Sequence, residues 1–98
     1  MERDYDALNK LLCAELRGEM ARVQITQEEV ADNLGISRQS ISRYLGEKPA
    51  KLPATTLIAW ADCLNVDPFE IQRNAYKRAG IQIPAIRQTI GGMTQTLS

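Results

Sequence analysis

The chain has 98 residues, is 44% hydrophobic and carries 12 basic and 12 acidic residues, so its formal net charge is zero. This length suits one domain with a modest core, no apolar run approaches the ~18 residues of a membrane span, and the N-terminus lacks the apolar stretch of a secretory signal. With no histidine and two widely separated cysteines, the chain lacks the residues of a zinc site and of the common kinds of enzyme active site. We therefore expect a cytoplasmic protein that is no enzyme, uses no cofactor, and keeps two buried, reduced thiols.

The first predicted element is an amphipathic helix over residues 4–22. Its apolar side chains recur at three- and four-residue steps, in the order Tyr5, Leu8, Leu12, Leu16 and Met20. Gly18 interrupts the helix at a cost of about 1 kcal/mol relative to alanine. The N-terminal part of this helix is expected either to pack against the last helix of the chain or to contact a second subunit.

Residues 26–45 predict two short helices joined by a tight turn. Thr26 and Glu29 have the spacing of a capping box, which starts a helix over residues 27–34. Gly35 follows that helix at a place where the backbone favours positive φ. Two helices joined by a glycine-containing turn of about 3–4 residues are the helix-turn-helix signature.

The second helix of this pair is predicted over residues 38–45. Ser37 is suited to cap its N-terminus, and Ile41 faces the core. Ile36, in the turn, is expected to fill the angle between the two helices. Ala31 in the preceding helix is small enough to let the two helices cross closely.

Two further helices complete an all-α chain. A loop with two prolines over residues 46–53 leads to a helix over 54–64. Asp67 then caps a helix that starts at Pro68 and ends at Gly80. The expected fold class is therefore a compact five-helix bundle.

The bundle is expected to occupy residues 1–80, followed by a flexible C-terminal tail over residues 81–98. The start of the tail, Ile-Gln-Ile-Pro, suits an extended strand, and the Gly91-Gly92 pair suits a turn. We expect the tail to be either disordered or part of a contact between subunits.

Four short motifs follow one another through the middle of the chain. Thr-Gln-x-x-Val-Ala stands at residues 26–31, Leu-Gly-Ile-Ser at 34–37, Ser-Ile-Ser-Arg at 40–43 and Leu-x-x-x-Ala-x-x-Leu-x-Val at 57–66. Together they resemble the Cro and lambda-repressor-type helix-turn-helix family, also called the XRE family, over about residues 8–72. The resemblance implies an all-α protein that regulates transcription by binding DNA.

The predicted base-reading residues lie on the helix over 38–45. Steps of about 100° per residue put Gln39 and Arg43 opposite its buried face. Ser42 lies beside them, and Arg38 and Ser40 lie at the N-terminal end of the helix. In helix-turn-helix proteins this end enters the major groove, where arginine pairs with guanine and glutamine with adenine. The candidates are Arg38, Gln39, Ser40, Ser42 and Arg43, and the alternative is an ordinary solvated helix face.

A second set of residues is expected to bind the DNA backbone without reading sequence. The resemblance implies that Gln27, at the start of its helix, binds a phosphate. Lys48 and Lys51 in the following loop, with Thr55 and Thr56 at the start of the next helix, are the candidates for a second phosphate contact. The alternatives are that Gln27 is only a good helix former, that the lysines only solubilise the loop and that one of the threonines only caps the helix.

The charged residues are sorted along the chain. Residues 2–32 hold eight acids and four bases, 33–60 hold four bases and one acid, and 71–98 hold four bases and no acid. A local surplus of bases that begins at the predicted recognition helix is an electrostatic footprint of DNA binding. Glu47 departs from the family pattern and would repel a phosphate, so Lys48 is expected to make the contact that follows this helix.

The expected partner is double-stranded operator DNA. The resemblance implies a phage- or plasmid-type repressor that binds a palindromic operator as a homodimer, with half-sites about 10 bp apart. The alternative is that the protein binds DNA as a monomer. No membrane and no small-molecule ligand is expected. The alternative function is a protein-interaction module or an antitoxin-like regulator built on the same fold, which the neutral net charge keeps open.

Overall fold

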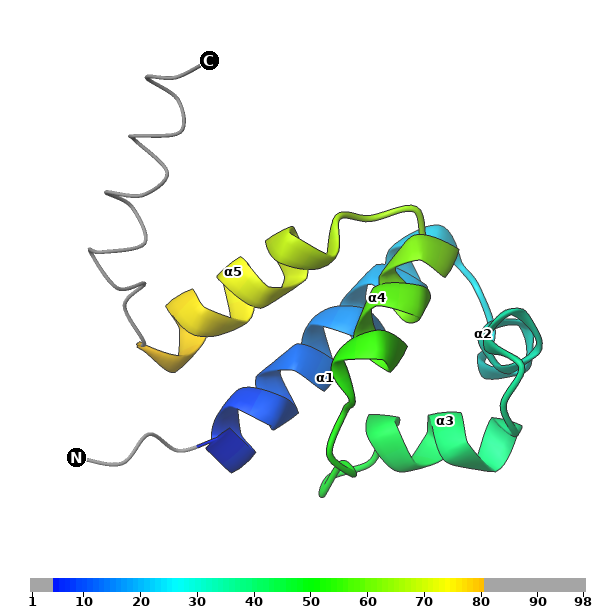
Figure 1. Cartoon of the computed structure of the whole chain (residues 1–98), viewed down its shortest axis with the longest axis horizontal. Coiled ribbons are helices and arrows are strands. Elements are labelled where there is room, and N and C mark those ends of the chain that lie inside the picture. The colour runs from blue at the N-terminus through cyan, green and yellow to red at the C-terminus, as the bar shows by residue number, and fades with distance from the viewer. Residues whose placement is uncertain (1–4, 81–98) are drawn as a thin grey trace, which may run out of the picture.

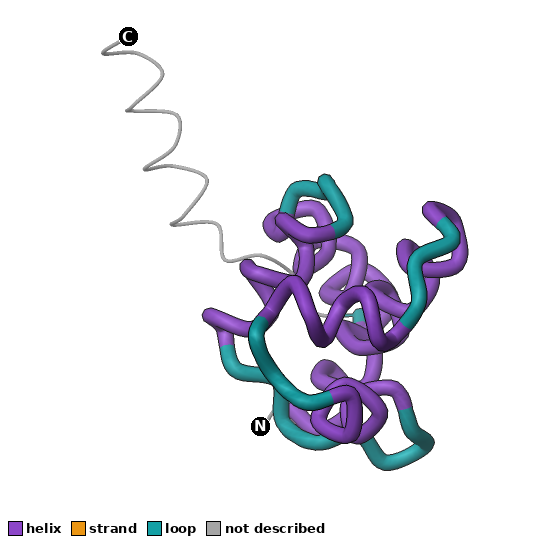
Figure 2. Tube along the Cα trace, turned by 90° about the vertical axis from the view of Figure 1, so that its right-hand side faces the viewer, coloured by secondary structure: helices purple, strands orange, loops and turns teal. Residues whose placement is uncertain are grey.

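The structure is a computed structural model that describes residues 5–80, so the predicted tail over residues 81–98 lies outside the described residues. Figure 1 shows the five helices in chain order, which are α1 Tyr5–Val23, α2 Gln27–Leu34, α3 Arg38–Leu45, α4 Ala54–Cys63 and α5 Pro68–Ala79. Figure 2 shows the same part of the chain as helices and loops without a strand. The predicted all-α, five-helix fold is confirmed, and each predicted helix boundary lies within one residue of the observed one.

Local capping explains why the helices begin where they do. The Thr26 hydroxyl accepts a hydrogen bond from the Glu29 N–H at 3.1 Å, and the Glu29 carboxylate accepts one from the Thr26 N–H at 3.0 Å. The Ser37 hydroxyl accepts the Ser40 N–H at 3.1 Å, and the Asp67 carboxylate accepts the N–H of the second residue of α5. Each bond satisfies a donor that has no partner within its helix, so the predicted caps are confirmed.

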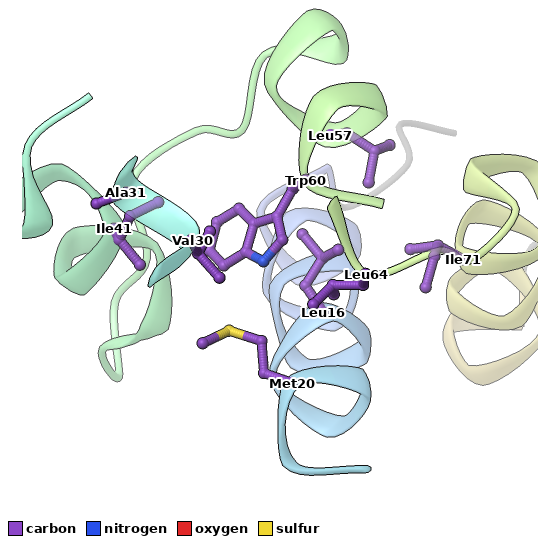
Figure 3. Close-up of a cluster of buried hydrophobic side chains, with 9 residues drawn as sticks. All are labelled: Leu16, Met20, Val30, Ala31, Ile41, Leu57, Trp60, Leu64 and Ile71. Carbon is purple, nitrogen blue, oxygen red and sulfur yellow. The ribbon is translucent and has the colours of Figure 1, made fainter. Parts of the chain in front are cut away.

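Trp60 of α4 lies at the centre of a core to which all five helices contribute (Figure 3). The cluster comprises Leu16, Met20, Val30, Ala31, Ile41, Leu57, Trp60, Leu64 and Ile71. The Trp60 ring is fully buried and meets Tyr44 edge to face, with ring centroids 6.0 Å apart. Burial of large side chains from every helix is the main source of stability for a domain of this size.

Helices α1 and α5 lie side by side and run in opposite directions (Figure 1). The Arg78 guanidinium of α5 binds the Glu15 carboxylate of α1 at 2.7 Å. α1 thus packs against the last helix, and the choice between this packing and a contact with a second subunit for its N-terminal part stays a prediction. Tyr5, its first described residue, is 64% exposed, so the expectation that Tyr5 joins the apolar face is wrong.

The expectation for Ile36 is also wrong, because 37% of this residue is exposed. The angle between α2 and α3 is filled instead by Val30, Ala31 and Ile41, which are 0–3% exposed. The Ile36 N–H donates to the Ala31 carbonyl at 3.1 Å, so its backbone closes the turn while its side chain stays at the surface.

Both cysteines are free thiols, and Cys13 is buried whereas Cys63 is half-buried. The expectation of a buried thiol is therefore confirmed for Cys13 and wrong for Cys63. Burial raises the pKa of the Cys13 thiol to about 11, against a smaller opposing effect of the Arg17 charge. Burial also raises the pKa of Cys63, with help from Asp62 and Glu29. Neither thiol is therefore activated as a nucleophile at neutral pH.

Candidate nucleic-acid interface

The turn between α2 and α3 sets how α3 projects from the molecule. Gly35 has φ of 69°, the left-handed conformation in which glycine carries no steric penalty. Ala31 is 3% exposed and Ile41 is fully buried, so the two helices meet through small and well-packed side chains. With its inner face held this way, α3 presents its outer face at the edge of the molecule (Figure 1).

The outer face of α3 carries the predicted base-reading residues. Arg38, Gln39, Ser42 and Arg43 are exposed, whereas Ser40 is half-buried. The Ser40 N–H and hydroxyl both contact the Ser37 hydroxyl, at 3.1 and 2.9 Å. Ser40 therefore belongs to the N-terminal cap of α3, and the other four residues are exposed.

The arginines of residues 5–80 divide into paired and unpaired groups. The ion pairs in this part of the chain are Arg22–Glu19, Arg73–Glu70 and Arg78–Glu15, all on α1 and α5. Arg17, Arg38 and Arg43 form no ion pair with the described residues. The guanidinium groups on and beside α3 therefore keep their charge available for an anionic ligand.

Ser42 and Gln27 connect α3 to the start of α2. The Ser42 hydroxyl donates a hydrogen bond to Oε1 of Gln27 at 2.7 Å. This bond fixes which way the Gln27 amide faces, and it leaves the amide NH₂ group as a donor. Gln27, at the first position of α2, is thereby held by the same helix that carries the candidate base readers.

The loop between α3 and α4 is held in place by Asn9 of α1. The Asn9 amide donates to the Ala50 carbonyl and accepts the Leu52 N–H, both at 2.9 Å. Lys48 and Lys51 in this loop are exposed. The loop that carries the predicted phosphate-binding lysines is thus fixed to α1 by two hydrogen bonds.

The first turn of α4 has no side-chain cap. Pro53 stands at the N-cap position, where its carbonyl accepts the Leu57 N–H at 2.9 Å but its side chain has no acceptor. The suggestion that a threonine caps α4 is therefore wrong. Thr55 is exposed and Thr56 is half-buried. The N–H groups at this helix start have no intrahelical partner, which suits an anion. Glu47 is exposed in the preceding loop and lines a groove with Lys48, where its charge opposes an anion.

This surface offers hydrogen-bond donors and positive charge, which suit an anionic ligand. Within residues 5–80, no three side chains of Asp, Glu or Cys are placed to hold a metal ion. None of the helices in the same range is both long and apolar enough to cross a membrane.

Two residues of this surface, Asn9 and Arg17, were not among the sequence candidates. Asn9 contacts a loop 41 residues away, and the Arg17 guanidinium donates to the Leu45 carbonyl, 28 residues away, at 2.6 Å. No spacing pattern within α1 signals either contact.

Comparison with known proteins gives one match. A protein-family model described as helix-turn-helix matches residues 17–71, which is more than half of the chain. No curated protein and no solved structure gave a significant match. The matched segment begins within α1 and ends within α5, and it contains α2, α3 and α4 in full.

Proposed function

The chain belongs to the helix-turn-helix family of the XRE type, whose members are DNA-binding transcription regulators, and on that premise we propose that it is a sequence-specific repressor. In this proposal α3 enters the major groove of an operator. The observation that carries it is the outer face of α3, where Arg38, Gln39 and Arg43 are exposed and neither arginine is committed to an ion pair in the described chain.

Base reading is assigned to Arg38, Gln39 and Arg43. An arginine donates two parallel hydrogen bonds to the O6 and N7 acceptors of guanine, and a glutamine pairs with adenine through its amide. Ser42 lies on the same face, but its hydroxyl proton is directed to Gln27. Ser40 is committed to the cap of α3, so both serines act mainly by holding the reading helix.

Backbone binding is assigned to the two flanks of α3. Gln27 offers its amide NH₂ at the N-terminus of α2, where the helix dipole favours a phosphate. On the other flank, Lys48 and Lys51 supply charge, while Thr55 and Thr56 stand in the uncapped first turn of α4. These contacts place α3 on the duplex and make binding depend on salt.

The proposal includes a homodimer on a palindromic operator in the cytoplasm, with repression by occupation of the operator. This part rests on the family, because helix-turn-helix dimers bind two half-sites about one helical turn apart. Two copies of the chain would place one α3 helix in each half-site. Sedimentation of the protein with an excess of one operator duplex tests it. Two chains per duplex are expected, and one chain per duplex would contradict the dimer.

The proposed function is tested by selecting bound duplexes from random-sequence DNA and measuring affinity by fluorescence anisotropy. Arg43→Ala should reduce the preference for the selected duplex over a mixed-sequence duplex by about 5- to 150-fold, because one good bidentate contact supplies about 1–3 kcal/mol of discrimination. Arg73→Ala is the matched control, because Arg73 lies on α5 and pairs with Glu70. An unchanged preference in Arg43→Ala would contradict the proposal that α3 reads the DNA sequence.

A further inference from the structure

An open groove between α1 and the start of α2 contains an arginine that the proposed contacts do not use. Arg17, Thr26, Gln27 and Leu45 line this groove, over an apolar floor that includes Met20 and Ile25. Arg17 supplies the only charged side chain among its lining residues. The groove therefore combines a guanidinium group with the amide of the proposed phosphate ligand Gln27.

The Arg17 guanidinium is fixed in position but its charge is not neutralised. Its Nη2 donates to the Leu45 carbonyl at the C-terminus of α3, at 2.6 Å. Arginine carries several further N–H donors in a planar fork that matches the oxygens of a phosphate. Within residues 5–80 it forms no ion pair, unlike Arg22 on the same helix, which pairs with Glu19 at 2.8 Å.

Arg17 also faces the second proposed phosphate site. It shares an adjoining groove with Lys10, Glu47 and Lys48, in which three bases outnumber one acid. The side chain thus stands between Gln27 on one flank of α3 and Lys48 on the other, and α1 itself packs against α3. Basic side chains therefore outnumber the one acid, Glu47, beside the C-terminal end of the reading helix.

We propose that Arg17 binds a DNA backbone phosphate together with Gln27, so that α1 and α2 hold one phosphate from two sides. This inference rests on the proposed function. The Ser42 hydroxyl occupies Oε1 of Gln27 and leaves the amide NH₂ for the phosphate. The Leu45 carbonyl fixes Arg17 in turn, so both donors are oriented before DNA arrives, which reduces the entropy lost on binding.

A structural role for Arg17 makes a different prediction. If Arg17 only caps the C-terminus of α3 through the Leu45 carbonyl, its replacement lowers stability and leaves the salt dependence of DNA binding unchanged. If it binds a phosphate, its replacement removes about one released counterion, so the slope of log K against log salt becomes shallower by about 0.9. The slope therefore separates the two roles.

The test measures this slope between about 50 and about 200 mM salt for a selected duplex and for a mixed-sequence duplex. Arg17→Gln should lose about tenfold in affinity for both duplexes, because a phosphate contact carries no sequence information. Its slope should be about 0.9 shallower, while Arg17→Lys keeps the wild-type slope. Arg22→Gln, which removes the same charge from the same helix outside the groove, should change neither quantity.

Phosphate ethylation interference gives a second test that needs no Arg17 variant. Ethylation of the shared phosphate should weaken binding of the wild-type protein, and it should still weaken binding of Gln27→Ala, because Arg17 continues to hold that phosphate. An unchanged slope in folded Arg17→Gln, or complete loss of the interference in Gln27→Ala, would overturn the inference. Absence of salt-dependent DNA binding by the wild-type protein would instead reject the proposed function itself.

Discussion

Replacement of Ser42 by alanine tests whether this side chain orients Gln27 or contacts DNA bases itself. The Ser42 hydroxyl donates to Oε1 of Gln27 at 2.7 Å, across the junction of α2 and α3. Loss of one such bond costs about 1 kcal/mol, which corresponds to about fivefold in affinity if the Gln27 amide must be oriented to meet its phosphate. Because a phosphate carries no sequence information, the loss should be equal for selected and mixed-sequence duplexes.

A double-mutant cycle measured by fluorescence anisotropy checks this prediction. Ser42→Ala and Gln27→Ala together should cost no more than Gln27→Ala alone, because without Gln27 the serine has nothing to orient. The coupling energy should then be about 1 kcal/mol. Additive losses, or a loss of preference at one base pair in Ser42→Ala, would refute this orienting role and return Ser42 to the base readers.

Three further predictions concern the loop, the core and a buried thiol. Asn9→Ala should lower the free energy of unfolding by about 1–2 kcal/mol and speed hydrogen exchange at the Leu52 amide, because both loop hydrogen bonds are lost; slow exchange at Leu52 would show that the loop is held otherwise. Leu16→Ala should cost about 2–5 kcal/mol at a fully buried site, whereas Phe69→Ala, at a side chain 68% exposed, should stay within about 0.5 kcal/mol in thermal melts; equal shifts would contradict the described core. Because burial raises the Cys13 pKa from 9.0 to about 11, the folded state holds this proton more tightly than the unfolded chain, so its contribution to stability is complete below pH 9 and is lost as pH rises towards 11. Denaturant titrations should show wild-type protein losing about 3 kcal/mol more than Cys13→Ala over that range, and parallel curves would reject the assignment.

Features that depend on neighbouring residues were predictable from the sequence. Thr26, Ser37 and Asp67 each accept a backbone N–H within three residues, and Gly35 provides the left-handed turn, so local spacing was enough to place four helix boundaries. The outer face of α3 followed from the period of the helix, because the position of buried Ile41 determines which side chains point away from the core.

Features that depend on the packing of distant segments were not predictable. Asn9 and Arg17 hold carbonyl groups that lie 41 and 28 residues away, and neither contact leaves a trace in the spacing of α1. The prediction that Ile36 is buried was wrong for the same reason, since the exposure of Ile36 depends on how completely its neighbours fill the angle between α2 and α3. The hydrogen-bond partner of such a polar residue can therefore be identified only from the folded arrangement of the helices.

The central claim is that α3 reads DNA sequence, and parallel selection from random-sequence duplexes with wild-type protein and Arg43→Ala tests it most directly. The wild-type protein should enrich one motif with two inverted half-sites about 10 bp apart. Arg43→Ala should enrich the same motif with its preference for one guanine relaxed in each half-site. Enrichment of no motif by the wild-type protein, or of an unchanged motif by Arg43→Ala, would contradict the claim.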